Sequence, residues 1–412
     1  MGLSPLLKGK RFIAMAPTTE TFASRNISFF RWLSAGAVVV MHATALLLAQ
    51  SDIMSAPHNF FEYFWWFVSN KEVGHKAVVG FFVISGYLVG GEVIRGARSG
   101  EAFYYGYFLK RFARIYIVLA PALAFTFLID SVGAGLFRKG GFYNDPMFAG
   151  HFSLDVFALN LFNLQDILTE PYGTNIPLWS LAVEVWYYIT FPLLLMPIMT
   201  HLSTRLRLFW FCLAVLVCGY FSLVSYLFFW GYVMWIAGAL TAVARKPVMR
   251  SYWAALALFV IIIIPVRLLV RGPLVESFPS ARTASDVVCA LAFTNVLLSA
   301  RFSIPRIFGS LPSFRLDMPN FTYSLYLTHL PIIVFVRAGL ESVAPGWALQ
   351  NATIGNWLVM FCVIAGAGVF AYLFSSATEA KTTSFRGFLD RKIEGLARVL
   401  ALFDVGRTRA GR

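Results

Sequence analysis

Residues 30–49 read FRWLSAGAVVVMHATALLLA, and they decide the fold. The stretch is 20 residues long and carries only two ionisable side chains, Arg31 and His42. An α-helix of about 20 apolar residues reaches across the ~30 Å hydrocarbon core of a bilayer, because each residue adds about 1.5 Å. We therefore expect residues 30–49 to cross a membrane as one helix.

Nine more apolar stretches of similar length follow along the chain. They lie at 75–94, 112–131, 178–199, 208–223, 225–244, 252–270, 284–300, 321–340 and 356–377. The composition agrees, because 58% of the 412 residues are hydrophobic and only 13% are charged, which leaves too little polar surface for a soluble domain. The sequence predicts an all-α, polytopic integral membrane protein with about ten transmembrane helices.

The apolar run 152–164 is an exception to this pattern. It is shorter than the others and contains Asp155, Asn160 and Asn163. Polar groups in contact with lipid would be left without hydrogen-bond partners, so we interpret the run as a re-entrant or interfacial piece within the long loop 133–177.

The basic residues indicate the orientation of the helices. If the N-terminus is cytoplasmic, 26 of the 34 Lys and Arg residues fall on the cytoplasmic side and 8 fall outside. Cytoplasmic loops are enriched in Lys and Arg, so this asymmetry places both termini in the cytoplasm and explains the net charge of +14 without a nucleic-acid partner.

The same pattern divides the chain into three parts. We expect a cytoplasmic N-terminal tail over 1–28, a ten-helix membrane domain over 29–378 and a basic amphipathic cytoplasmic tail over 379–412. The helical spacing of apolar residues in the last part is typical of a helix at a membrane surface, and a tail packed on the protein is the alternative.

Ionisable groups inside the predicted spans are few, and each is a functional candidate because it is costly in lipid unless paired or hydrated. His42 follows Arg31 by eleven residues, so both lie on one helix face about 16 Å apart. Glu184 and His329 reach a similar depth from two other spans. This convergence predicts a buried polar cavity where an imidazole is suited to remove a proton from a hydroxyl. A packing histidine and a transporter cavity are the alternatives.

A basic motif lies at the predicted cytoplasmic surface. Lys110-Arg111-Phe112-Ala113-Arg114 puts Arg111 and Arg114 at i and i+3 on one helix face. Paired guanidinium groups are suited to bind phosphate. Ordinary anchoring of the helix by basic residues is the alternative.

Several motifs, in this order along the chain, resemble the membrane acyltransferase-3 family. They are Arg31 and His42 with ten residues between them, Phe81-Phe82-Val83-Ile84-Ser85-Gly86-Tyr87-Leu88, Arg111-Phe112-Ala113-Arg114-Ile115-Tyr116, Leu178-Trp179-Ser180-Leu181 with Glu184 and Tyr188, Phe229-Trp230 to Gly238, and Tyr323-Ser324-Leu325-Tyr326-Leu327-Thr328-His329. The chain departs from the family pattern at Val79, Ile117 and Val185, and in the late element Glu379-Ala380-Lys381.

Members of that family are ten-helix proteins of the bacterial cytoplasmic (inner) membrane that move an acyl group, usually acetyl, from cytoplasmic acyl-CoA to hydroxyls of cell-envelope carbohydrates. The resemblance implies that His42 is the catalytic histidine and that Arg31 is its partner on the same helix. It implies that Arg111 and Arg114 bind acetyl-CoA or another acyl-CoA, and it implies no metal. Membrane lipid and an extracytoplasmic glycan, such as an exopolysaccharide or a lipopolysaccharide, are the expected partners.

We expect other polar and aromatic groups at this depth to line the cavity. Glu184 is placed to orient an imidazole or to bind sugar, and Tyr or Ser hydroxyls are suited to donate to an oxyanion. The predicted substrate-binding residues are Trp179, Ser180, Tyr323, Tyr326 and His329. Hydrogen bonds that merely hold helices together are the alternative for each of them.

Two other functions are compatible with the same residues. A transporter or flippase for a glycan or lipid would also need buried polar groups along its path. A relative that has lost catalysis would only bind a glycan or a partner protein. The sequence leaves open the acyl group, the accepting hydroxyl and the oligomeric state. It also leaves open whether His42 acts on the hydroxyl or carries the acyl group in a transient covalent acyl-enzyme.

Overall fold

The computed structural model of this chain describes most of the protein. The described residues are 21–49, 57–99, 103–137, 142–145, 148, 150–199, 202–269, 280–303, 321–349 and 351–409, without the side chains of 267–269 and 397–409. Most of the predicted N-terminal tail and the last three residues of the predicted C-terminal tail lie outside the described residues.

The described residues form helices and no named strand. The α-helices are α1 Phe22–Leu47, α2 Phe60–Ser69, α3 Lys71–Ser85, α4 Gly91–Ser99, α5 Tyr104–Leu136, α6 Leu154–Leu161, α7 Leu178–Leu194, α8 Thr204–Val224, α9 Tyr226–Val243, α10 Tyr252–Leu269, α12 Ser280–Phe302, α13 Thr322–Val343, α14 Ile354–Ala377 and α15 Thr382–Arg409. A π-helical turn, Gly86–Gly90, joins α3 to α4, and short 3₁₀ turns lie at Phe142–Asn144, Met196–Ile198 and Glu379–Lys381.

The prediction of an all-α, multi-pass membrane protein is confirmed. In the part of the chain that is described, nine helices are long and apolar enough to cross a bilayer. The predicted span 252–270 corresponds to α10, which is apolar over Tyr252–Val266, the part whose side chains are described. Each of the ten predicted spans therefore coincides with a helix of the structure.

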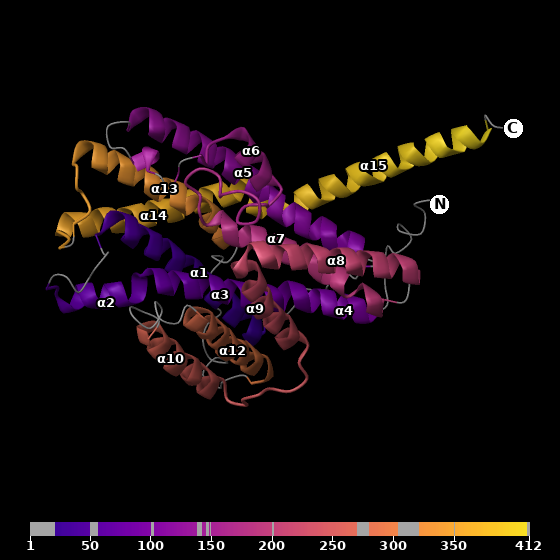
Figure 1. The fold of residues 1–412 in the computed structure, drawn as a ribbon, viewed down its shortest axis with the longest axis horizontal. Helices are drawn as coiled ribbons and strands as arrows, with labels where there is room; N and C mark the ends of the chain where they lie inside the picture. Colours follow the sequence, from indigo (N-terminus) through magenta and orange to yellow (C-terminus); the bar gives the residue numbers. More distant parts are fainter. Residues whose placement is uncertain are drawn as a thin grey trace.

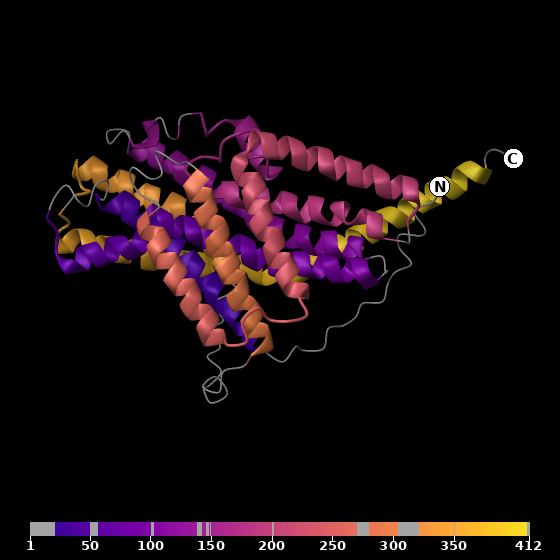
Figure 2. The same ribbon diagram turned by 60° about the horizontal axis from the view of Figure 1, so that its bottom comes forward.

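The helices form one elongated bundle. In Figures 1 and 2, α3, α5, α13 and α14 run roughly along its long axis, whereas α9, α10 and α12 are inclined to that axis. The bundle is held by large buried side chains, among which Tyr187, Phe228 and Trp235 are almost completely inaccessible. Tyr187 also stacks on Tyr232, with ring centroids 4.5 Å apart. Aromatic packing of this kind fixes α7 against α9.

The π-helical turn after α3 brings the backbones of α3 and α9 close together. A Cβ added at Gly86 would overlap the carbonyl oxygen of Trp235, and one added at Gly238 would overlap the carbonyl oxygen of Val83. Only glycine permits this approach. The close contact matters for the site described below, because Ser85 and Trp235 meet there through a hydrogen bond of 3.0 Å.

Replacement of Gly86 by alanine should destabilise the bundle. Backbone atoms of α9 cannot move aside as a flexible side chain could, so we expect Gly86→Ala to cost about 1–3 kcal/mol. Gly219→Ala is the matched control, because a Cβ there meets nothing within 4 Å and alanine favours a helix by roughly 0.5–1 kcal/mol. Thermal unfolding in detergent should show a lower Tm for Gly86→Ala alone, and equal Tm values would contradict the packing described.

The segment between α5 and α7 folds over the outer parts of α5 and α13. The predicted re-entrant run 152–164 forms only the short helix α6 and is not a further span. The buried carboxylate of Asp130 accepts the Thr174 backbone N–H and hydroxyl, both at 2.9 Å. The Asn175 amide donates to the Leu327 carbonyl at 2.8 Å, so the segment is anchored to both helices.

The C-terminal helix α15 begins against the bundle and then leaves it. The Tyr105 hydroxyl donates to Asp390 at 2.7 Å, which joins α5 to the first part of α15. Beyond that contact α15 projects from the end of the bundle (Figure 1). Packing on the protein, one of the two alternatives for this tail, therefore holds for its first turns.

Candidate active site

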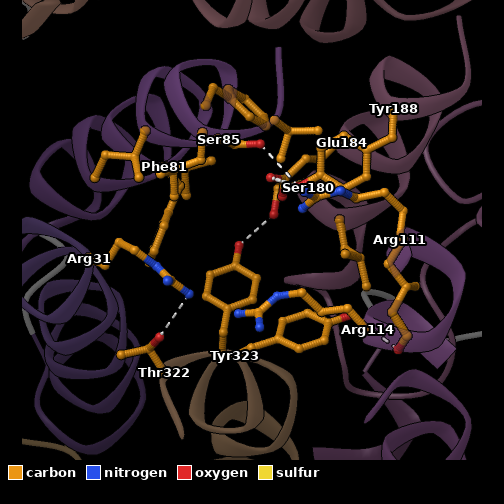
Figure 3. Close-up of a pocket in the computed structure, with 18 of the residues that line it drawn as sticks. Arg31, Phe81, Ser85, Arg111, Arg114, Ser180, Glu184, Tyr188, Thr322 and Tyr323 are labelled. Atoms are coloured by element: carbon orange, nitrogen blue, oxygen red, sulfur yellow. Dashed lines mark hydrogen bonds between the residues drawn. The ribbon is translucent and has the colours of Figure 1, made fainter. Parts of the chain in front are cut away.

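A cavity of about 400 Å³ lies among α1, α3, α5, α7 and α13. It begins at the end of the bundle that carries Lys110, Arg111 and Arg114, which we call the basic end, and this is the predicted cytoplasmic end. The guanidinium groups of Arg31 and Arg114 enter it from opposite walls (Figure 3). The cavity therefore joins residues that are far apart in the sequence.

Ion pairs and aromatic rings hold the arginines at the mouth of the cavity. Glu92 accepts from both Arg111 and Lys110, the latter at 2.9 Å. The Arg111 guanidinium also lies over the rings of Tyr107 and Tyr188, 5.7 and 5.8 Å from their centroids. These contacts fix the planar group of Arg111 and leave its charge near the cavity.

A second carboxylate holds Arg114 from the other side. Glu379 lies 3.6 Å from the Arg114 guanidinium and accepts from the Ser324 backbone N–H and hydroxyl at 3.2 and 3.1 Å. Because Ser324 follows Tyr323 in the first turn of α13, Glu379 links Arg114 to a helix that lines the cavity. Glu379 belongs to the segment Glu379-Ala380-Lys381, where the chain departs from the family pattern, and its carboxylate nevertheless contacts the site.

The charges that line the cavity favour a polyanion. Its cations are Arg31, Lys110, Arg111 and Arg114, and its carboxylates are Glu92 and Glu184. This excess of positive charge lies around a partly enclosed space, where Coulomb interactions are stronger than in bulk water. A ligand with several phosphates fits such a mouth better than a neutral solute does.

Glu184 is held on the α7 side of the cavity by a chain of hydrogen bonds. Tyr188, one turn further along α7, donates to Glu184 at 2.5 Å, and the Tyr188 and Ser85 hydroxyls are 3.0 Å apart. Trp235 completes the chain through its bond to Ser85. The π-helical turn after Ser85 therefore helps to set the orientation of the half-buried Glu184 carboxylate.

The far end of the cavity is closed by paired hydroxyl groups. Ser180 and Tyr326 are joined by a hydrogen bond of 2.6 Å between their oxygens, and the Phe81 ring packs against Tyr326 with centroids 5.8 Å apart. On the opposite wall Arg31 donates to Thr322 at 3.5 Å. The Ser180 and Tyr326 hydroxyls thus lie on the side of the cavity that a ligand extending inward from the mouth would reach last.

Two histidines lie directly beyond this wall. The Nδ1 atom of His42 and the Nε2 atom of His329 are 2.9 Å apart, and the ring of His329 is 6.0 Å from that of Tyr326. Arg31 and His42 both contact α13, as expected from their positions on one face of α1. The His pair therefore adjoins the cavity but does not line it in this conformation.

The hydrogen bonds determine which nitrogen of His42 is free to act as a base. His329 Nδ1 lies 3.0 Å from the carbonyl oxygen of Leu325, which can only accept, so this nitrogen carries a proton. In a neutral ring the Nε2 atom of His329 is then an acceptor, and His42 donates to it through Nδ1–H. The remaining nitrogen of His42, Nε2, is unprotonated and has the lone pair that a general base needs.

The cavity contains most of the predicted site residues. Arg31, Arg111, Arg114, Ser180, Glu184, Tyr323 and Tyr326 line it, and His42 and His329 lie next to it. Trp179 is the exception, because it faces a separate small pocket with His75 and Asp286. The roles predicted for all these residues stay predictions.

Several contributors were not singled out from the sequence. Glu92 takes part in the site and was not named from the sequence, and Ser85, Lys110, Tyr188 and Glu379 had been noted only as parts of motifs. The spacing of Glu184 and Tyr188, one helical turn apart, was a usable signal. No spacing in the sequence indicated the contact between Glu92 and Arg111.

The described residues contain no group of three or more His, Cys, Asp or Glu side chains that could hold a metal ion.

The fold and the site define a multi-pass membrane protein with a basic, partly enclosed cavity that is lined by hydroxyl groups and adjoins a His pair. A comparison with protein families shows that residues 25–376 match the acyltransferase domain of the acyltransferase-3 family, and the chain belongs to that family. No curated protein and no solved structure matches the chain. The protein is accordingly a member of a membrane acyltransferase family.

Proposed function

We propose that the protein is an O-acyltransferase that moves an acyl group, most simply acetyl, from acyl-CoA in the cytoplasm to a hydroxyl of a carbohydrate outside the cytoplasm. The observation that carries the proposal is the order of groups along one path. Cations surround the mouth of the cavity, hydroxyls close its inner wall, and an imidazole with a free lone pair lies directly behind that wall.

Acyl-CoA suits this path because its charged and reacting ends are far apart. The phosphates of the donor would contact Arg111, Arg114 and Lys110, since guanidinium groups bind phosphate through two parallel hydrogen bonds. The uncharged arm would extend between α1 and α7, past Arg31. Its thioester would then reach the wall formed by Ser180 and Tyr326.

The transfer can be written with the groups present. His42 Nε2 accepts the proton of the acceptor hydroxyl while that oxygen attacks the thioester carbonyl carbon. The carbon–oxygen bond forms, the carbon–sulfur bond breaks, and the departing thiolate takes the proton from His42. Tyr326 and Ser180 share one hydrogen bond, and the hydroxyl whose proton is not used between them is suited to donate to the oxygen that becomes negative during the attack.

This function places the protein in the bacterial cytoplasmic membrane, with the basic end in the cytoplasm. The excess of Lys and Arg at that end supports the orientation. An extracytoplasmic glycan such as an exopolysaccharide or a lipopolysaccharide would then approach from the opposite end. Both substrates would meet near the depth of His42.

The ester content of the cell envelope tests the proposal. Polysaccharide and lipopolysaccharide should be isolated from cells with and without the protein, and their O-acyl groups measured by NMR. We expect one class of ester to disappear when the protein is absent and to return when it is restored. An unchanged ester content together with altered glycan export would instead support the transporter alternative.

His329 should matter through His42 and not through substrate contact. Its Nε2 atom accepts from His42, so His329→Leu should leave the base misoriented and lower kcat about 10–100-fold, within the range for loss of a general base. His329→Gln can still present an oxygen acceptor and should retain more activity. The KM for acyl-CoA should stay unchanged in both variants, and a KM effect without a kcat effect would contradict this role.

A further inference from the structure

The small pocket that contains Trp179 has an unusual set of walls for the interior of a membrane bundle. It lies among α3, α7, α9 and α12 at the end opposite the basic end. Its aromatic walls include Trp179, Tyr226 and Trp230, and its polar groups are His75 and Asp286. Ionisable groups within a membrane bundle are functional candidates by default, and the site described above does not use these two.

The polar groups are held in fixed positions. Asp286 accepts from His75 at 2.8 Å and from Lys76, and the Lys76 ammonium also donates to Ser285 at 2.6 Å. Lys76 and Asp286 are almost completely buried, whereas the side chain of His75 keeps 18% of its accessible surface. The buried Lys76–Asp286 pair thus supports a histidine that a ligand can reach.

The pocket and the donor cavity are neighbours. Val78 and Phe82 line both, so the two spaces lie on either side of these side chains. Val38 belongs to the same hydrophobic cluster as Val78 and Phe82, and it lies one helical turn before His42 on α1. The residue one turn before the proposed base thus belongs to the same apolar cluster as the two side chains that separate the spaces.

The pocket is nearly closed in this structure. Its free volume is about 10 Å³, the space of roughly one water molecule. The Tyr226 hydroxyl and the Thr283 hydroxyl are 2.5 Å apart and join α9 to α12 at the outer side of the pocket. Tyr226 is half exposed, so its ring can move without disturbing the core.

We propose that this pocket is the docking site of the carbohydrate acceptor, which enters from the end opposite the basic end when Tyr226 moves. The proposal rests on the proposed function and adds the position of its second substrate. Flat aromatic rings can pack on the apolar faces of a sugar ring, and His75 with Asp286 can hydrogen bond its hydroxyls, in the way that pockets combine apolar walls with a few polar groups. A sugar held there would present a hydroxyl across Val78 and Phe82 to the donor cavity.

Kinetics with two variable substrates test this assignment. The probe is the polysaccharide fraction extracted from cells that lack the protein, with radiolabelled acetyl-CoA as donor and purified protein in detergent. We expect Trp230→Ala and His75→Ala to raise the KM for the polysaccharide about tenfold, which corresponds to ~1.4 kcal/mol. The KM for acetyl-CoA should stay within a factor of two, because the donor cavity is intact.

Two further variants guard against a general loss of folding. Trp230→Phe keeps an aromatic ring in the pocket and should raise the polysaccharide KM less than Trp230→Ala does. Trp253→Ala removes a half-exposed tryptophan of α10 that does not line the pocket and should leave both KM values unchanged. Quenching of tryptophan fluorescence by the same polysaccharide, without acetyl-CoA, gives a binding measurement that does not need turnover.

The outcomes separate this inference from the proposed function. If the wild-type protein transfers no acetyl group to the polysaccharide, the proposed function fails. If the wild type transfers acetyl groups but Trp230→Ala and His75→Ala leave the polysaccharide KM unchanged, the pocket holds only water and the inference is overturned. Equal increases in both KM values would overturn it as well, because they would indicate a distorted bundle.

Discussion

His42→Asn should abolish acyl transfer while the protein still folds and inserts. The amide of asparagine can keep the hydrogen bond that His42 Nδ1 donates to His329, but it has no group equivalent to the free Nε2 atom. Loss of a general base typically costs about 10²–10⁴-fold in rate, so we expect a fall of that size in kcat. The rate should be measured with purified protein, radiolabelled acetyl-CoA and polysaccharide from cells that lack the protein.

A second histidine provides the control for this experiment. His58 lies at the start of α2 and bonds Glu62 at 3.1 Å, remote from the cavity. His58→Asn should therefore keep wild-type kcat and KM values. An active His42→Asn protein, with yield and Tm like those of the wild type, would show that another group removes the proton.

Arg111→Ala and Arg114→Ala should each weaken the use of acyl-CoA. Hydrogen bonds to charged groups contribute about 1.5–3 kcal/mol, so we expect kcat/KM for acetyl-CoA to fall roughly 10–100-fold in each variant. Arg111→Lys keeps the charge but loses the planar group that lies over Tyr107 and Tyr188, and it should recover only part of the loss. Initial rates over a range of acetyl-CoA concentrations measure the effect.

A donor without phosphates shows whether these arginines act on the nucleotide end. S-acetylpantetheine has the same thioester and no phosphate, so wild-type and arginine variants should use it equally slowly. Arg205→Ala, at an exposed position of α8 near the same end of the bundle, should behave like the wild type with both donors. Equal impairment of the arginine variants with both donors would place Arg111 and Arg114 in another role.

The helices were predictable because lipid leaves the chain few alternatives. A span such as 30–49 must satisfy its own backbone hydrogen bonds, so an apolar run of this length can only be a helix. The joint approach of Arg31 and His42 to α13 was also predictable, because helical geometry alone puts them on one face. Glu184 and Ser180 reached the cavity for the same reason, since they lie one turn apart on α7.

Contacts between helices that are distant in the sequence were not predictable from the hydrophobic pattern. The sequence gives the depth of His329 and Trp179, but it does not give the direction in which each helix turns its side chains. His329 therefore meets His42 behind the wall of the cavity, and Trp179 turns away toward His75 and Asp286. The Glu379 contact with Arg114 likewise depends on how α14 ends against α5 and α13.

The central claim is that acyl-CoA enters at the basic end and that its acyl group leaves at the opposite end. Purified protein should be reconstituted into liposomes, and molecules with the basic end outside should receive labelled acetyl-CoA outside and polysaccharide inside. We expect labelled ester on the enclosed polysaccharide, with none for His42→Asn. Labelled ester that forms only when both substrates are on the same side of the membrane would contradict the claim.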